Sequence, residues 1–235
     1  MSILIVGGTS GIGLATARRL AATGADVHVA SRDAAKVAAI AATDPELVAH
    51  RLDGGDGPAV AELGARLAPL DALIVTLAGA EGSGTLAELD LDSLRRAFEA
   101  KYWPTLIVLK NALPHLAERA SITLVGAVSA HAFLAGVAGI GSLNAAVEGL
   151  VRPLAAELAP RRVNAVSPGL VDTPWWNGLS AGEREAWFSA AAEALPVGHV
   201  STADEIAEAV VLAATSTSMT EAVLNVDGGA RFARF

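Results

Sequence analysis

The amino-acid sequence predicts a single α/β domain in which a doubly wound, seven-stranded parallel sheet has helices on both faces. Three observations predict this fold class. Short β-rich runs alternate with longer segments rich in Ala and Leu along the whole chain. No proline lies inside the strand-like runs, and such strand–helix alternation is typical of a parallel sheet covered on both sides. With 235 residues and no internal linker or repeat, the chain is most simply one domain, 1–235.

The expected elements follow one another in a regular order. Strands are expected over 3–6, 26–31, 47–52, 72–78, 121–126, 162–167 and 222–227. Helices are expected over 14–23, 33–42, 58–68, roughly 91–117, roughly 142–159 and 203–215. Pro153 lies inside the fifth of these helices and should kink it or remove one of its hydrogen bonds. Residues 172–200 break the alternation and are expected to be an insertion.

Composition disfavours several classes of protein. Apolar residues make up 52% of the chain and charged residues 18%, which favours a sizeable core over disorder. The net charge of −8 is opposite to the basic surface that nucleic acids require, so no nucleic-acid partner is expected. The absence of cysteine removes disulfides, thiolate metal sites and cysteine nucleophiles, and no metal site is predicted. The N-terminus has no basic leader and no apolar run reaches about 18 residues, so we expect a soluble, cytoplasmic protein without a membrane partner.

The motif GGTSGIG at 7–13 is the first indication of function. It follows the first expected strand and opens the first expected helix. Glycine there permits a tight turn and lets backbone N–H groups approach a pyrophosphate, while the helix N-terminus adds a partial positive charge. In this context the motif favours a dinucleotide site over a purely structural turn. The candidate cofactor-binding residues are Gly7, Thr9, Ser10, Gly11, Ile12 and Gly13.

The end of the second expected strand indicates which dinucleotide binds. A site for NAD places a carboxylate there to bind the ribose, but this chain has Ser31 followed by Arg32. A guanidinium suits a 2′-phosphate, which a carboxylate would repel. The alternative is that Arg32 pairs with Asp33 on the surface. We interpret Ser31 and Arg32 as contacts to NADP(H).

Further motifs give the chain a resemblance to a known family. LD (52–53) ends the third expected strand, TLAG (76–79) ends the fourth, and RVNAVSPGLVDTP (162–174) spans and follows the sixth. With GGTSGIG, LPVGHVSTADEIA (195–207) and VDGG (226–229), these stretches resemble the short-chain dehydrogenase/reductase family over nearly the whole chain. The resemblance implies a Rossmann-type fold, a cofactor across the C-terminal edge of the sheet, and often a homodimer or homotetramer.

The resemblance also implies further cofactor contacts. Asp53 matches the acid that meets the adenine amine in the family. Ala78 and Gly79 match the end of the family's Asn-Asn-Ala-Gly motif, whereas Thr76 and Leu77 do not. The family's Pro-Gly motif, whose following residues hold the nicotinamide amide, is matched by Pro168, Gly169, Val171 and Thr173.

The four positions that the resemblance assigns to catalysis hold other residues. The family uses a Tyr as general acid/base, a Lys four residues on, a Ser that orients the carbonyl and an Asn that holds a relay water. These positions fall on Ile140, Asn144, Ala127 and Lys101. The chain has one tyrosine, Tyr102, and residue 106 is leucine, so it contains no Tyr-x-x-x-Lys sequence.

Three residues are candidate catalytic replacements. Ser129 and His131 follow the fifth expected strand, on a loop expected to line the site. Ser129 could replace the serine in a shifted register, and His131 could donate a proton near neutral pH or be a surface histidine. Asn144 could hydrogen-bond the nicotinamide ribose in place of Lys, without its charge. Lys101 could be a catalytic amine, but near Glu99 we expect a solvated helix-face charge.

Three of the four tryptophans lie within 175–187, directly after the Pro-Gly motif. The resemblance implies that 172–200 is a lid over the substrate. Trp175 and Trp176 are the candidate substrate contacts, and they favour an apolar or ring-containing small molecule. Trp187 and Phe188 could instead pack on the body of the protein or on another subunit.

The sequence therefore predicts an NADP(H)-dependent reductase of a carbonyl, imine or enone, with a nonstandard proton donor. Orientation of a hydride donor alone can supply about 7–11 kcal/mol, so the reaction need not require the usual acid. Two alternatives stay open. One is an NADP(H)-binding sensor or regulatory protein without redox activity, and the other is an isomerase or cyclase on the same scaffold.

Overall fold

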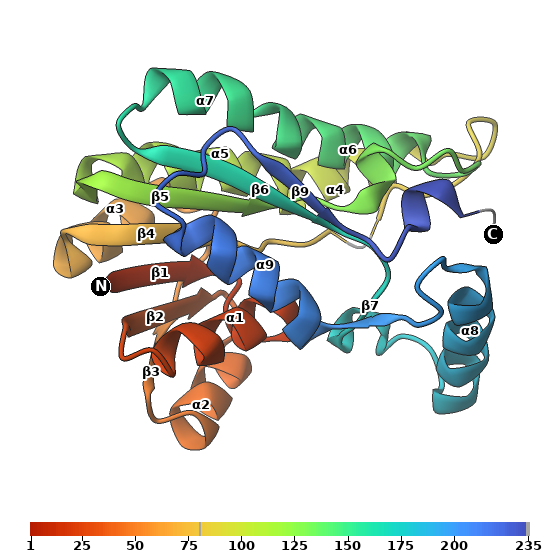
Figure 1. The fold of residues 1–235 in the computed structure, drawn as a ribbon, viewed down its shortest axis with the longest axis horizontal. Coiled ribbons are helices and arrows are strands. Elements are labelled where there is room, and N and C mark those ends of the chain that lie inside the picture. Colours follow the sequence, from red (N-terminus) through yellow and green to blue (C-terminus); the bar gives the residue numbers. More distant parts are fainter. Residues whose placement is uncertain (80, 234–235) are drawn as a thin grey trace.

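The computed structural model describes residues 1–79 and 81–233 and confirms the predicted sheet. Within these residues the larger sheet has seven strands in the spatial order β3-β2-β1-β4-β5-β6-β9, and all neighbours are parallel (Figure 1). The order reverses between β1 and β4, which is where doubly wound sheets bind ligands. The strands are β1 Ser2–Val6, β2 Asp26–Ser31, β3 Leu47–Arg51, β4 Leu70–Val75, β5 Leu116–Val125, β6 Arg162–Pro168 and β9 Val223–Val226.

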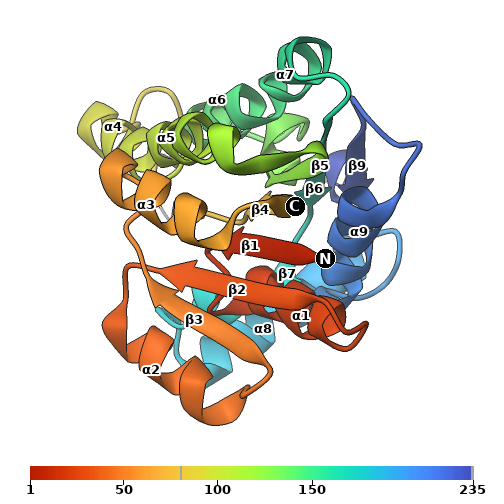
Figure 2. The ribbon, with the colours of Figure 1, turned by 90° about the vertical axis from the view of Figure 1, so that its left-hand side faces the viewer.

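Helices cover both faces of the sheet, as predicted (Figure 2). One face is packed by α1 (Gly11–Ala21), α2 (Ala34–Thr43) and α9 (Ala203–Thr215), with Leu20 and Val210 fully buried between helix and sheet. The other face is packed by α3 (Gly57–Leu67), α5 (Tyr102–Ala112), α6 (Ala138–Gly149) and α7 (Val151–Glu157), which bury Val60 and Val147. No helix in the described ranges is long and apolar enough to cross a membrane.

The two longest expected helices are each broken, and each break lies three residues before a proline. The first becomes α4 (Leu91–Ala100) and α5, which join at Lys101, and the second becomes α6 and α7, which join at Leu150. Pro153 was expected to disturb its helix, and Pro104 acts in the same way. Proline has no N–H for the carbonyl four residues back, and its ring crowds that carbonyl. The break at Lys101 (φ −125°, ψ −59°) turns this residue out of the regular helix.

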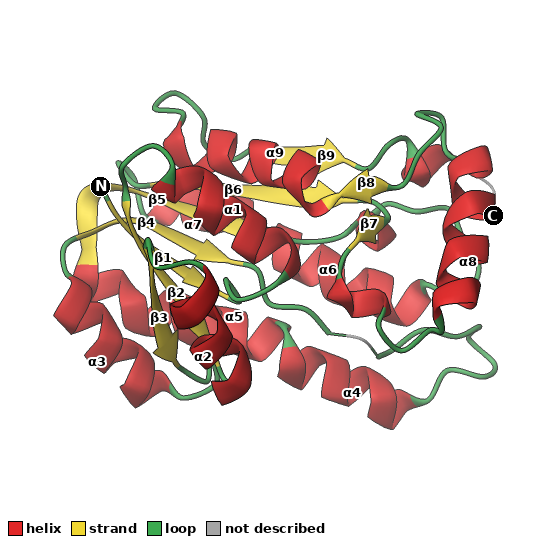
Figure 3. Ribbon diagram, turned by 90° about the horizontal axis from the view of Figure 1, so that it is seen from below, coloured by secondary structure: helices red, strands yellow, loops and turns green. Residues whose placement is uncertain are grey.

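The 172–200 segment departs from the strand–helix alternation, as expected. Its ends are held by two short parallel strands, β7 (Val171–Asp172) and β8 (Ser201–Thr202), which were too short to predict from the sequence. Between them lie the short 3-10 helix η3 (Pro174–Trp176) and helix α8 (Ala181–Ala194). Helix α8 stands apart from the helices that cover the sheet, at the end of the molecule toward which the central strands point (Figure 3).

Candidate active site

A cavity of about 510 Å³ opens along the carboxyl edge of the sheet. Its walls come from the β1–α1 turn, the ends of β4, β5 and β6, helix α6 and the beginning of the 172–200 segment. A second cavity of about 770 Å³ continues from it over the ends of β2 and β3. The two adjoin, because they share the lining residues Gly7, Ser10, Lys36, Thr76, Leu77 and Ala78.

The β1–α1 turn forms a cradle made of backbone. Gly7 and Gly11 have positive φ values of 92° and 51°, which disfavour other residues. A Cβ on Gly13 would overlap the carbonyl oxygen of Gly7 and lie 2.6 Å from Thr76 Oγ1. Ser10 precedes α1 without a side-chain cap, so the N–H groups of the first helical turn keep no acceptor within the helix. The backbone N–H groups at the start of α1 can bind a pyrophosphate, because the glycines beside them let it approach the backbone closely. All six residues predicted for this site, Thr9 and Ile12 included, line one or both cavities.

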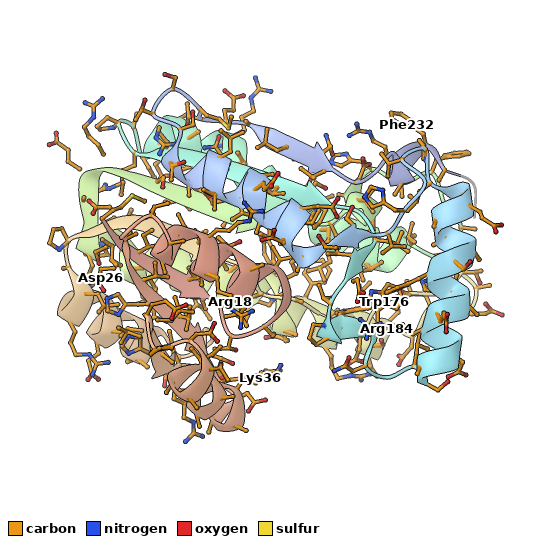
Figure 4. All side chains as sticks on the ribbon, turned by 60° about the horizontal axis from the view of Figure 1, so that its bottom comes forward. Arg18, Asp26, Lys36, Trp176, Arg184 and Phe232 are labelled. Atoms are coloured by element: carbon orange, nitrogen blue, oxygen red, sulfur yellow. The ribbon has the colours of Figure 1, made fainter. Side chains whose placement is uncertain are left out.

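The second cavity has the cation that the sequence suggested, Arg32, and one more. Ser31, Arg32 and Asp53 all line it, as does Lys36, which the sequence analysis did not assign to the cofactor (Figure 4). The alternative pairing of Arg32 with Asp33 does not occur. Asp33 instead caps α2 by accepting hydrogen bonds from the backbone N–H groups of Ala35 (2.9 Å) and Lys36 (3.2 Å). Among the described residues Arg32 has no ion-pair partner, so its guanidinium is available at the cavity.

The opposite end of the first cavity collects the residues expected around a nicotinamide. Ala78 and Gly79 follow β4, while Pro168 ends β6 and Gly169 follows it. Gly169 is required there, because a Cβ would lie 2.5 Å from the carbonyl oxygen of Asp227. Val171 and Thr173 line the same wall as the chain enters the 172–200 segment. The structure thus brings all the cofactor candidates to one edge of the sheet.

Lys101 was expected to be a solvated surface charge, and the structure shows that this is wrong. Its side chain is buried and lines the first cavity, with 6% of the residue exposed. Nζ donates hydrogen bonds to Asn144 Oδ1 (2.7 Å) and to the carbonyl oxygen of Gly126 (3.1 Å). Burial lowers the pKa of Lys101 to about 8, while the nearby charge of Glu148 acts in the opposite direction. The physical reason is the helix break before Pro104, which turns Lys101 toward β5 and α6.

Asn144 and Ser129 extend the polar contacts of Lys101. Asn144 Nδ2 donates to Ser129 Oγ (2.9 Å) and to the carbonyl oxygen of Ile140 (3.0 Å), which fixes the amide with its oxygen toward Lys101. Ser129 Oγ accepts this bond, so its own O–H remains available to donate. Asn144 is 2% exposed, and all three side chains belong to residues that line the cavity. The result is a chain of hydrogen bonds that begins at a buried amine and ends at a hydroxyl.

A comparison with models of protein families identifies the family of this chain. The family model described as enoyl-(acyl carrier protein) reductase matches residues 6–231. The chain belongs to the short-chain dehydrogenase/reductase family. It is thus a member of a family of NAD(P)-dependent oxidoreductases. The sequence motifs and the observed fold both indicate this family.

Individual members of the short-chain dehydrogenase/reductase family match almost the whole chain. A cis-4-hydroxycyclohexanecarboxylate dehydrogenase from Sinomonas cyclohexanicum is 35% identical, over 96% of this chain and 94% of the relative. A 2-keto-3-deoxy-L-fuconate dehydrogenase from Xanthomonas campestris pv. campestris is 31% identical, over 96% of this chain and 78% of the relative. The crystal structure of a small-chain dehydrogenase in complex with NADPH is similar with a TM-score of 0.85 and 35% identity, and the match covers 98% of each chain.

The positions matched to the catalytic groups of short-chain dehydrogenases/reductases meet at the cavity. Lys101, Ala127, Ile140 and Asn144 all line it. Ala127 and Ile140 contribute no ionisable or hydrogen-bonding side chain, whereas Lys101 and Asn144 bind each other. The four residues that the resemblance matches to the family's catalytic positions therefore lie at one cavity, with Lys101 at the junction of α4 and α5 and Asn144 on α6.

His131, in contrast, does not reach the cavity of this short-chain dehydrogenase/reductase. Its Nε2 lies 2.6 Å from Glu148 Oε2, and its side chain is 43% exposed. The expectation that the whole loop after β5 lines the site is therefore correct for Ser129 and wrong for His131. Ser129 lies within the short 3-10 helix η2 (Val128–Ala130), whereas His131 is the residue that directly follows this helix.

The tryptophans of the 172–200 segment divide into two groups. Trp175 and Trp176 line the cavity, as predicted, and Trp176 Nε1 donates to the carbonyl oxygen of Val171 (3.0 Å). Trp187 and Phe188 pack on Trp176, with ring centroids 6.2 Å and 5.7 Å from it, and do not line the cavity. Arg184 of α8 binds Asp172, and its guanidinium carbon lies 5.3 Å from the centroid of the Phe188 ring.

Proposed function

We propose that the protein is an NADP(H)-dependent oxidoreductase that reduces a carbonyl, imine or enone, with a proton donor other than the tyrosine of its family. The observation that supports this most strongly is the continuity of the site. One cavity is lined at one end by the glycine cradle and at the other by Ser129, Asn144 and Lys101. A site built only to sense a nucleotide has no use for buried polar donors at the nicotinamide end.

The preference for NADP(H) over NAD(H) rests on charge. Arg32 and Lys36 both line the adenosine end, and the residue at the end of β2 is Ser31 rather than a carboxylate. Two cations at this end, with Ser31 in place of a carboxylate at the end of β2, favour a 2′-phosphate. The structure of a similar small-chain dehydrogenase in complex with NADPH supports the same choice. When bound, the reduced nicotinamide supplies the hydride.

The residues of the chain would hold and polarise the substrate. The Ser129 hydroxyl accepts from Asn144 and is free to donate to the substrate oxygen. A donor already fixed by a second hydrogen bond stabilises developing negative charge without reorganisation. Asn144 is therefore a positioning residue as well as a candidate contact to the cofactor ribose.

The substrate is proposed to be a small molecule with a ring or a bulky apolar group. Trp175 is 48% exposed and lies at the cavity beside Trp176, and together they offer flat apolar surface. Residues 172–200 are proposed to close over this substrate as a lid. The name of the similar cis-4-hydroxycyclohexanecarboxylate dehydrogenase is consistent with a ring substrate.

A panel assay tests the proposed function directly. The purified protein is mixed with NADPH and with cyclic ketones, cyclic imines and cyclic enones, and NADPH absorbance is followed. We expect at least one class to consume NADPH in a protein-dependent manner. Tight NADPH binding with no consumption on any class would contradict the proposal and favour a sensor. Conversion of a substrate without loss of NADPH would favour an isomerase or cyclase.

A further inference from the structure

We propose that Lys101 is the proton donor of this site, acting from the α4–α5 junction through its Nζ atom. The inference deepens the proposed function and rests on it. The sequence alone did not favour this residue, because Lys101 was expected on a solvated helix face. Two features of the structure argue for it: the geometry of the side chain and its hydrogen bonds at the cavity, and the charges around it.

The first feature is geometry. Lys101 lines the same cavity as Ser129, Asn144 and the nicotinamide-end residues. Nζ has two described acceptors, Asn144 Oδ1 and the Gly126 carbonyl oxygen, but a lysine ammonium has three N–H donors. One N–H is therefore left for a third acceptor, and the cavity is where a substrate oxygen can supply it. The position matched to the family's tyrosine holds Ile140, which has no proton to offer.

The second feature is the set of charges that face Lys101. From α6, Glu148 lies against Gly126, since a Cβ on Gly126 would overlap Glu148 Oε1. That oxygen is buried and has no hydrogen-bond partner among the described residues, whereas Oε2 binds His131. From α2, Lys36 lines the cavity, and from α5, Tyr102 follows Lys101 and packs between Phe98 and Trp103. The negative charge of Glu148 favours the ammonium form, whereas burial favours the amine.

These opposed effects suit an acid that must give up its proton and take it back. Burial holds the pKa of Lys101 at about 8, so the side chain is mostly protonated at neutral pH and can lose its proton at low cost. As the substrate carbon accepts the hydride, the carbonyl π electrons move to oxygen. An O–H bond then forms to this oxygen, and one N–H bond of Lys101 breaks. Lys101 is left as a neutral amine, and solvent returns the proton.

The wild-type protein allows a test that needs no substrate. The chain has three lysines, Lys36, Lys101 and Lys110, so lysine labelled with ¹³C at Cε gives three side-chain signals. We expect Lys101 to titrate near its pKa of about 8, below the ordinary lysine value of about 10.4. NADP⁺ and NADPH differ by one positive charge on the nicotinamide ring. A midpoint for Lys101 that is lower with NADP⁺ than with NADPH, by about half a pH unit or more, places its amine beside that ring.

Variants then separate proton donation from a structural role. Lys101→Met removes the proton, and Lys101→Arg keeps a cation and its hydrogen bonds but binds its proton too tightly to release it. Both should lower the turnover number by about 100-fold or more and leave NADPH affinity nearly unchanged. Lys110→Met, on the outer side of α5, is the matched control and should behave as wild type. In the wild type, the rate of reduction should fall as pH rises through about 8, because the acid must be protonated.

The outcomes separate this inference from the proposed function. If the wild type binds no NADPH, both fail. If NADPH binds but Lys101 titrates at the ordinary lysine value of about 10.4, or has the same midpoint with both forms of the cofactor, the inference about Lys101 is overturned while the proposed function stands. If Lys101→Arg turned over at the wild-type rate and with the wild-type pH profile, the inference would likewise be overturned, and the role of Lys101 would be that of a structural cation.

Discussion

The two ends of the first cavity are built in different ways. The cradle at the β1–α1 turn consists of backbone from residues that are consecutive in the sequence, and its shape depends on missing side chains. The opposite end consists of side chains from separate segments: Lys101 and Asn144 are 43 residues apart, and Asn144 and Ser129 are 15 apart. A site made of backbone tolerates almost no substitution, whereas one made of side chains can keep its function while its residues change places.

The largest effect on cofactor binding is expected when a side chain is introduced into the backbone cradle. Gly13→Ala places a Cβ into the Gly7 carbonyl oxygen and beside Thr76 Oγ1. It should abolish NADPH binding and lower the free energy of unfolding by about 3 kcal/mol. Calorimetric titration and thermal unfolding measure the two effects. The control is Gly149→Ala at the end of α6, where a Cβ meets nothing within 4 Å, and it should be neutral or slightly stabilising.

The next largest effect is expected at the hydroxyl that ends the polar chain. Ser129→Ala removes the donor to the substrate oxygen and should lower the turnover number by about 100-fold. NADPH affinity should not change, since Asn144 Nδ2 keeps its bond to the Ile140 carbonyl oxygen. Ser142→Ala, whose hydroxyl binds Gly139 within the same helix, is the matched control. Steady-state kinetics on the best substrate decides, and equal rates for both variants would remove Ser129 from the mechanism.

A smaller effect, on cofactor affinity, is expected at the adenosine end, where side chains again form the binding site. Arg32→Ala removes a charge-assisted contact worth about 1.5–3 kcal/mol, so NADPH should bind about 10–100-fold more weakly. NADH affinity should stay as in the wild type. Arg51→Ala, an exposed arginine at the end of β3 that does not line the cavity, serves as control. Equal losses for NADPH and NADH would mean that Arg32 does not read the 2′-phosphate.

The smallest effect on turnover is expected at His131, which lies outside the cavity. His131→Ala should change the turnover number by less than about threefold, because the histidine is not the acid. It should lower the free energy of unfolding by about 1–3 kcal/mol, since the buried Glu148 carboxylate loses its partner. Kinetics and thermal unfolding of one preparation measure both. A turnover loss larger than the loss at Ser129 would return His131 to the catalytic role that the sequence allowed.

The same contrast explains what could be predicted from the sequence. The seven strands and the glycine cradle follow from local patterns, because strand periodicity and glycine spacing are properties of neighbouring residues. Lys101 could not be placed in this way, since its burial depends on a helix break before Pro104 and on acceptors from Gly126, which follows β5, and from Asn144 on α6. Lys36 was missed because a helix residue gives no sequence signal of facing a groove. His131 was misplaced because a three-residue 3-10 helix turned the loop.

The central claim is that an NADP(H) site is fully formed beside a rearranged set of proton donors. Calorimetric titration of the wild-type protein with NADPH and with NADH tests its foundation most directly, without knowledge of the substrate. We predict that NADPH binds more tightly than NADH by about tenfold or more, as expected for a 2′-phosphate held by Arg32 and Lys36. Equal affinity, or tighter binding of NADH, would contradict the account.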